Sequence, residues 1–257
     1  MEEALCEAAK NGDVREVKEI LRNFPTVNVN WRDNADGCAP LHAACRNFHD
    51  PVVAILLDRP DVDVNQRDNN GDTPFLRACY WGNTRCVRLL LRDPRVKINI
   101  LDNLGYSPLR WASRWSYLET IKVWIASGRE MDLGQPGNEW TDAIAVAEKW
   151  GKTEVVALLQ RFKTDPVKTR HTTRVNLACH GELAAEVFAM VVFLSDGLLK
   201  ITQDGQAQTV AARFFRIAGQ LPLELQMVLC YHVIGSPRVV IHRKDSELAF
   251  KDLAKRI

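Results

Sequence analysis

The stretch GDTPFLRAC at residues 71–79 occurs three times in this chain in slightly different forms. The other two copies are GCAPLHAAC at 37–45 and GYSPLRWAS at 105–113, which places the prolines at 40, 74 and 108 at intervals of 34 residues. An apolar segment follows each copy: VVAILL at 52–57, CVRLLL at 86–91 and TIKVWI at 120–125. Self-similarity at this period predicts a repeat architecture.

Two weaker copies flank these three. The first reads ALCEAAKNGDVREVKEIL at 4–21, and the last reads DAIAVAEKWGKTEVVALL at 142–159. One position is shared by all five copies and is usually glycine: Gly12, Phe48, Gly82, Ser116 and Gly151. The sequence therefore predicts five consecutive repeats.

Turn and cap residues explain the quoted motif. Glycine at 71 and 105 suits a tight turn in which positive φ is free of strain. Asp68 and Asp102 stand three residues earlier and are expected to accept hydrogen bonds from turn amides. Thr73 is a good helix N-cap, and the proline after it suits the first helical position. Ser107 and Asp142 are expected to cap the corresponding helices of the fourth and fifth repeats.

Each repeat is expected to contain two helices. Alanine occupies one position of the first helix in every copy, which allows close packing: Ala8, Ala44, Ala78, Ala112 and Ala147. Apolar residues at helical spacing mark the second helix, as in Val87, Leu90 and Leu91. A single repeat cannot bury such a stripe, whereas stacked repeats can.

These motifs closely resemble those of ankyrin repeats, whose signature is a Gly-x-Thr-Pro-Leu-His run. The resemblance implies an all-α solenoid of five helix-turn-helix repeats that binds a protein along its concave face. The expected array covers 1–163, with repeats near 1–32, 33–67, 68–101, 102–137 and 138–163. A linker at 164–174 and a helical C-terminal segment at 175–257 are expected to follow.

The composition fits a folded protein without a nucleic-acid footprint. Of 257 residues, 46% are hydrophobic and 26% are charged, and the formal net charge is only +2. The first residues, MEEALCEAAKNG, lack a secretory pattern, and no apolar run reaches membrane-spanning length. We therefore expect a monomer in the cytoplasm, with the nucleus as an alternative, that binds neither nucleic acid nor membrane.

No enzymatic activity, metal or cofactor is expected. The run Cys38, His42, Cys45 and His49 resembles metal-ligand spacing, but the repeat register accounts for three of these four residues. Glycine-rich phosphate loops and nucleophile-elbow motifs are absent from the sequence. We therefore predict no catalytic residues and no metal-binding residues.

Ankyrin proteins use hairpin tips and the polar side of the first helix to contact partners. Transferred by register, this resemblance predicts the following partner-binding residues: Arg46, Asn47, Asp72, Tyr80, Trp81, Tyr106, Arg114, Trp115, Lys149 and Trp150. Trp81, Trp115 and Trp150 occupy one position in three consecutive repeats, so they are expected to form a row. Tryptophan, tyrosine and arginine often carry binding energy at interfaces. The alternative is that these indoles belong to the framework.

Two interpretations of residues 175–257 remain open. The helices expected there could cap the last hydrophobic face of the stack. The segment LPLEL at 221–225 also resembles the start of an F-box, a helical module that binds the Skp adaptor of a ubiquitin ligase. That resemblance implies an adaptor-binding set of Leu221, Pro222, Leu223, Leu225 and Leu229, and a substrate-recruiting subunit as the alternative function.

Overall fold

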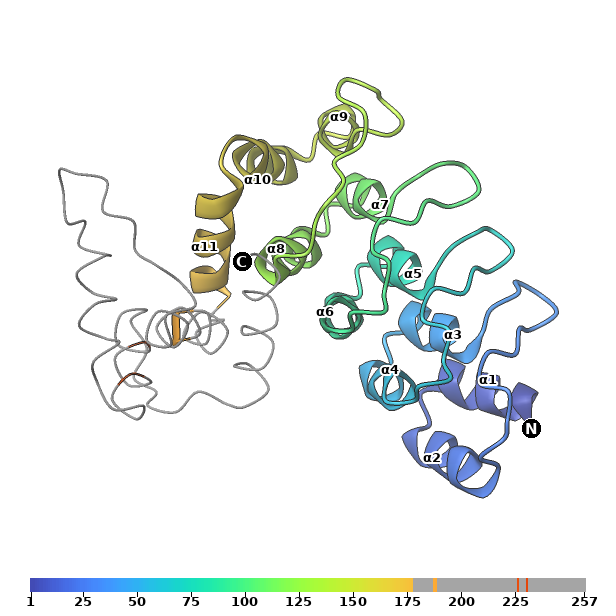
Figure 1. The fold of residues 1–257 in the computed structure, drawn as a ribbon. Coiled ribbons are helices and arrows are strands. Elements are labelled where there is room, and N and C mark those ends of the chain that lie inside the picture. The colour runs from blue at the N-terminus through green and yellow to red at the C-terminus, as the bar shows by residue number, and fades with distance from the viewer. Residues whose placement is uncertain (178–186, 189–225, 227–229, 231–257) are drawn as a thin grey trace. The chain divides into compact units, whose positions relative to one another are not determined.

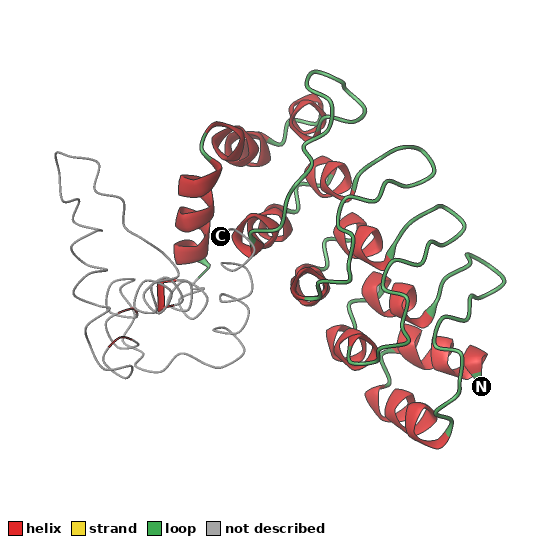
Figure 2. Ribbon diagram, viewed as in Figure 1, coloured by secondary structure: helices red, strands yellow, loops and turns green. Residues whose placement is uncertain are grey.

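The computed structural model describes residues 1–177, 187–188, 226 and 230, and the chain divides into two units, Met1–Thr173 and Arg174–Ile257. Within the described residues all regular structure is helical (Figure 2). The helices are α1 (Glu2–Asn11), α2 (Val14–Asn23), α3 (Pro40–Arg46), α4 (Asp50–Leu57), α5 (Pro74–Tyr80), α6 (Thr84–Arg92), α7 (Pro108–Arg114), α8 (Leu118–Ser127), α9 (Ala143–Lys149), α10 (Thr153–Thr164) and α11 (Pro166–Asn176).

The first unit is a stack of helix pairs in two layers. The helices α1, α3, α5, α7 and α9 pack in succession, and α2, α4, α6, α8 and α10 form the second layer. Figure 1 shows the pairs stepping along an arc, with the loops that precede α3, α5, α7 and α9 projecting on the same side. This architecture confirms the predicted all-α solenoid.

Hydrogen-bonded caps start the first helices of the third, fourth and fifth repeats, as predicted. Thr73 Oγ1 accepts a hydrogen bond from the backbone N–H of Leu76 at 3.2 Å. Ser107 Oγ accepts one from Arg110 N–H at 3.1 Å, and Asp142 Oδ1 accepts one from Ile144 N–H at 2.9 Å. A cap of this kind stabilises a helix by about 1 kcal/mol because it satisfies an otherwise unpaired donor.

The turn before each of the helices α5 and α7 is organised by an aspartate. Asp68 Oδ1 accepts hydrogen bonds from the N–H groups of Asn70 at 2.8 Å and Asp72 at 3.0 Å. Asp102 Oδ1 does the same for Leu104 at 2.9 Å and Tyr106 at 2.8 Å. The turn glycine of α5, Gly71, has φ 79°, a conformation that suits glycine. The expectation for both aspartates is confirmed.

The core lies between the two helix layers. Every alanine of the repeated position is buried, which lets successive first helices approach closely. Trp124 on α8 is fully buried and meets Phe75 of α5 edge-on, with ring centroids 4.9 Å apart. This tryptophan fills a position at which the other repeats carry isoleucine or leucine, so it belongs to the core.

The usual glycine position between the paired helices is occupied by Phe48 in the second repeat and by Ser116 in the fourth. Both adopt the left-handed conformation, with φ 66° and 61°. In the third repeat, a Cβ on Gly82 would lie 2.5 Å from the ring of Tyr117. Phe48 is followed one repeat later by the smaller Asn83, which bonds the Cys45 carbonyl at 3.1 Å. The bulk of the neighbouring repeat thus influences which residue fits here.

The segment expected as a linker at 164–174 forms helix α11 instead. Asp165 Oδ1 accepts a hydrogen bond from Lys168 N–H at 2.9 Å, and Pro166 occupies the first helical position. The Asp-Pro pair is therefore a helix start. The helix is polar and largely exposed, which is why hydrophobic periodicity did not reveal it.

Most of the second unit is outside the described residues. This applies to Leu221, Pro222, Leu223, Leu225 and Leu229, so both interpretations of the C-terminal segment stay predictions. Among the helices that the structure describes, none combines the length and apolar character of a membrane span.

Candidate functional site

Six aromatic side chains from three repeats form a connected cluster, here called the aromatic face: Tyr80, Trp81, Tyr106, Trp111, Trp115 and Trp150. They come from α5 and the residue after it, the turn before α7, α7 and the residue after it, and the residue after α9. Three of these indoles, at Trp81, Trp115 and Trp150, are exposed by 38%, 46% and 50%. Large apolar side chains that remain this accessible side by side indicate a contact surface.

Tyr80 connects the indoles of neighbouring repeats. Its ring centroid lies 5.3 Å from that of Trp81, 4.8 Å from that of Trp111 and 6.5 Å from that of Trp115. All three contacts are edge-to-face, the arrangement that the ring quadrupoles favour. The row predicted from Trp81 and Trp115 is thus continuous, although a tyrosine supplies the link.

Arg114 completes the row toward the fifth repeat. Its guanidinium carbon lies over the rings of Trp150 at 4.6 Å, Trp115 at 5.3 Å and Trp111 at 5.7 Å. Each such contact contributes about 0.5–1 kcal/mol at an exposed site. Arg114 therefore holds the indoles of the fourth and fifth repeats in one surface.

Trp111 lies on α7 and is only half-buried. Its Nε1 donates a hydrogen bond to Asp102 Oδ2 at 3.0 Å, and its ring also meets Tyr106 with a centroid distance of 5.5 Å. The indole thus supports the turn and contributes to the aromatic face. An alignment of the repeats could have predicted this role, because the equivalent residue in the third repeat is Arg77, which donates a hydrogen bond to the turn aspartate Asp68.

Arg110 is a central residue that the sequence analysis missed. It lies on α7 one turn before Arg114, and its residue surface is 2% exposed. The guanidinium carbon is 3.7 Å from the Tyr106 ring centroid and 4.3 Å from that of Trp111. Its Nε donates to the Trp140 carbonyl at 3.0 Å, while its buried Nη1 has no hydrogen-bond partner among the described residues. Burial lowers the pKa of this guanidinium.

Cations at the two ends of the surface are paired with carboxylates. Arg46 lies 5.7 Å from the Trp81 ring and bonds Asp36 Oδ2 at 3.0 Å. Lys149 lies 4.7 Å from the ring of the exposed Trp140 and bonds Glu139 Oε2 at 2.7 Å. Both predicted residues therefore lie at the surface in ion pairs.

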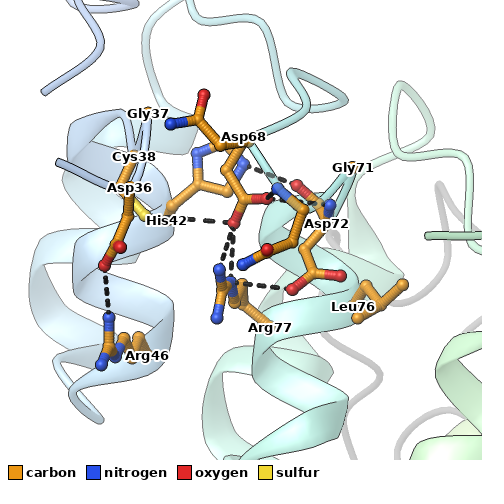
Figure 3. Close-up of polar contacts among 12 residues, drawn as sticks. Asp36, Gly37, Cys38, His42, Arg46, Asp68, Gly71, Asp72, Leu76 and Arg77 are labelled. Carbon is orange, nitrogen blue, oxygen red and sulfur yellow. Dashed lines mark hydrogen bonds and ion pairs between the residues drawn. The ribbon is translucent and has the colours of Figure 1, made fainter. Parts of the chain in front are cut away.

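Asp72 is a correction to the predicted set, because its carboxylate is turned into the protein. Figure 3 shows Arg77 between the side chains of Asp68 and Asp72. Arg77 Nη2 is 2.6 Å from Asp68 Oδ2, and its Nε is 3.1 Å from Asp72 Oδ2. Only 7% of Asp72 is exposed, and burial raises the pKa of its carboxyl to about 6. The hairpin position alone could not reveal that the next helix carries a buried arginine.

His42 joins this network from the second repeat. Its Nδ1 accepts a hydrogen bond from Ala39 N–H at 3.2 Å. With that nitrogen as acceptor, Nε2–H donates to the carbonyls of Gln66 at 2.9 Å and Asp72 at 3.1 Å. Burial lowers the pKa of His42, which favours this neutral form. The side chain thus ties the second repeat to the loop of the third.

The remaining predicted residues have framework contacts as well. Asn47 is exposed, and its Nδ2 donates to the Ala43 carbonyl of its own helix at 2.9 Å. Tyr106 is half-buried beneath Arg110. Groups of three or more His, Cys, Asp or Glu side chains suited to a metal do not occur in the described part of the chain.

The chain matches a family model described as ankyrin repeats in many copies, over residues 41–91. It is 40% identical over 67 residues to human SMC5-SMC6 complex localization factor protein 1, which covers 25% of this chain and 6% of that protein. It is 34% identical over 77 residues to human Rabankyrin-5, covering 30% and 6%. Human 2-5A-dependent ribonuclease is 35% identical over 81 residues, covering 32% and 10%.

The matches cover only a small part of each of these relatives, and the three relatives are different proteins. What they share with this chain is the repeat. The matched residues include the quoted GDTPFLRAC motif, and the structure places that motif in one of a series of stacked helix pairs. Within the helix-pair array, residues 41–91 are similar to ankyrin repeats, the kind of module that mediates protein–protein interactions.

Proposed function

We propose that this chain captures a partner protein on the aromatic face. The observation that carries the proposal is the row of three exposed indoles, joined through Tyr80 and Arg114 across three repeats. Framework residues of this size are normally covered, whereas these rings remain accessible beside an arginine. Aromatic and arginine side chains with this arrangement are those that most often dominate binding energy.

The arrangement favours binding over catalysis. The polar side chains of the surface are held in ion pairs or stacked on rings, so no described nucleophile stands beside a base there. The thiols of Cys38, Cys45 and Cys79 are buried, and burial raises their pKa values. We accordingly propose a scaffold or recruiting role without chemistry of its own.

The test compares the full chain with the triple variant Trp81→Ala, Trp115→Ala and Trp150→Ala. Affinity capture with quantitative mass spectrometry is expected to lose its specific partners, because each hot-spot indole is worth about 2 kcal/mol or more. The affinity of a purified partner should fall about 100-fold or more. Circular dichroism should show unchanged helical content, and thermal stability should fall only modestly, because the three side chains are about half-exposed and each lost cation–ring contact contributes about 0.5–1 kcal/mol.

A matched control removes exposed apolar side chains elsewhere. Phe24 and Val167 are both exposed and lie outside the aromatic face, so Phe24→Ala with Val167→Ala should retain every partner. Equal partner loss in this control, or full capture by the triple variant, would overturn the proposal.

The substrate-recruiting alternative depends on residues 221–229 and a Skp-type adaptor. Those residues are outside the described part of the chain, and no observation on the repeat array favours this role. Capture on the aromatic face is compatible with both roles, a scaffold and a subunit that recruits the captured protein to a ubiquitin ligase.

A further inference from the structure

The charges on the aromatic face differ between its ends and its centre. At the ends, the cations of Arg46 and Lys149 are each neutralised by a carboxylate within 3.0 Å. At the centre, the guanidinium of Arg114 makes no hydrogen bond or ion pair with any described residue and is covered only by indole rings. A guanidinium offers five donors, so this one has unused binding capacity.

A second cation reinforces the centre from below. Arg110 lies one helical turn away, buried, with one backbone hydrogen bond and an unpartnered Nη1. The carboxylate that acts on it, Asp102, is already bonded to Trp111 and to two turn amides. A buried charge without an ion-pair partner is costly, and a nearby anion lowers that cost. The interior of α7 therefore adds to the positive potential at Arg114.

We propose that the aromatic face recognises a protein segment bearing a single carboxylate, which forms an ion pair with Arg114 while apolar neighbours lie on Trp115 and Trp150. This inference rests on the proposed function and names the chemistry of its partner. The planar guanidinium suits bidentate pairing with a carboxylate, and the surrounding rings exclude water, which strengthens the pair. An aspartate or glutamate side chain and a C-terminal carboxylate offer the same group.

Charge complementarity disfavours a polyanion such as nucleic acid or a multiply phosphorylated segment. Asp36 and Glu139 flank the surface at its two ends, and both carboxylates are half or more exposed. A ligand with charges along its whole length would meet these carboxylates as well as Arg114. A ligand with one anion among apolar residues meets none of that repulsion.

The experiment selects peptides on the full chain from a displayed random library. One arm displays peptides with blocked C-termini, and the other displays them with free C-termini. We expect the selected sequences to share one Asp or Glu next to aromatic or aliphatic residues, or a free C-terminal carboxylate in the second arm alone. Replacing that acid by its amide in a synthetic peptide should weaken binding about tenfold or more, since a charged hydrogen bond is lost.

Protein variants then assign the carboxylate to Arg114. Arg114→Gln should show the same tenfold loss and no further loss with the amide peptide. Arg85→Gln, which removes an exposed cation of α6 outside the aromatic face, should change affinity by less than about threefold. In Arg114→Glu, a peptide with lysine in place of its acid should bind better than the original peptide. Thermal unfolding of each variant confirms an intact array.

The outcomes separate this inference from the proposed function. Selected peptides that require Trp115 but carry no acid would support the proposed function and refute the carboxylate inference. The same conclusion would follow if the peptides' preference for an acid persisted in Arg114→Gln. Selection of peptides rich in acidic or phosphorylated residues would also overturn it. Peptides indifferent to the three tryptophan substitutions, or no selection at all, would overturn both.

Discussion

Helices α5 and α7 are copies of the same seven-residue helix, yet each buries an arginine in a different environment. Arg77 on α5 lies between two carboxylates, at 2.6 Å from Asp68 and 3.1 Å from Asp72. Arg110 on α7 has no ion pair with any described residue and lies between the rings of Tyr106 and Trp111. The comparison teaches that one repeat framework can use a buried cation either to neutralise the carboxylates of the preceding turn or to add positive charge beneath a surface.

The register of the two repeats explains the difference. Arg77 corresponds to Trp111, whose indole N–H takes the place of the guanidinium on the turn aspartate. Arg110 corresponds to Leu76, which is fully buried in the core. The third repeat therefore balances its charges internally, while the fourth leaves a cation that its own carboxylates do not neutralise.

The largest expected effect is on the balanced network. Arg77→Leu would leave Asp68 and Asp72 buried without their cation and should lower stability by about 3–5 kcal/mol. Chemical denaturation followed by circular dichroism measures this loss. The control Arg85→Leu removes an exposed arginine of α6 and should change the free energy of unfolding by no more than about 0.5 kcal/mol. Similar stability of the two variants would show that the buried network contributes little.

The corresponding change in the fourth repeat should act in the opposite direction. Arg110→Leu introduces the residue that the third repeat already carries and removes a buried cation without an ion pair. Removing the desolvation cost of the buried guanidinium should outweigh the loss of its hydrogen bond to the Trp140 carbonyl and of its ring contacts. The free energy of unfolding should therefore rise by about 1 kcal/mol. The same denaturation measurement applies. A loss as large as that of Arg77→Leu would refute the distinction between the two arginines.

The smallest effect concerns Asp72 and pH. Burial raises the pKa of this carboxyl to about 6, against an ordinary value near 4, while Arg77 opposes the shift and Asp68 and Asp102 reinforce it. Between those values the folded chain holds a proton that the unfolded chain has lost, so this group's contribution to stability is present below pH 4 and is lost as pH rises through 6. Asp72→Asn imitates the protonated form.

We therefore expect Asp72→Asn to raise the melting temperature, relative to the unmodified chain, more at pH 8 than at pH 5. Asp68 retains its contact with Arg77 at 2.6 Å, so the array should remain folded. Asp36→Asn, at an exposed ion pair, provides the control and should show the same difference at both pH values. A larger benefit at pH 5 would contradict the assigned direction of the pKa shift.

Much of the fold could be predicted from local patterns. The 34-residue spacing, the caps at Thr73 and Ser107 and the turn aspartates Asp68 and Asp102 involve contacts within a few residues, which register alone can align. The exposed row of Trp81, Trp115 and Trp150 could also be anticipated, because equivalent positions in stacked repeats share one face. Its role in binding remains the proposal made above.

The sequence by itself determined the repeat, its helix starts and the small residues that allow stacking, since these depend on short-range hydrogen bonds and helical periodicity. Only the tertiary structure decided which polar side chains are buried and with what. Asp72 occupies a hairpin position but pairs inward with Arg77, and Arg110 occupies a core position but stacks on Tyr106. The physical reason is that these pairings depend on how each turn folds back onto the helix that follows it, which brings Asp72 to Arg77 and Tyr106 to Arg110, and the repeat pattern does not specify that geometry.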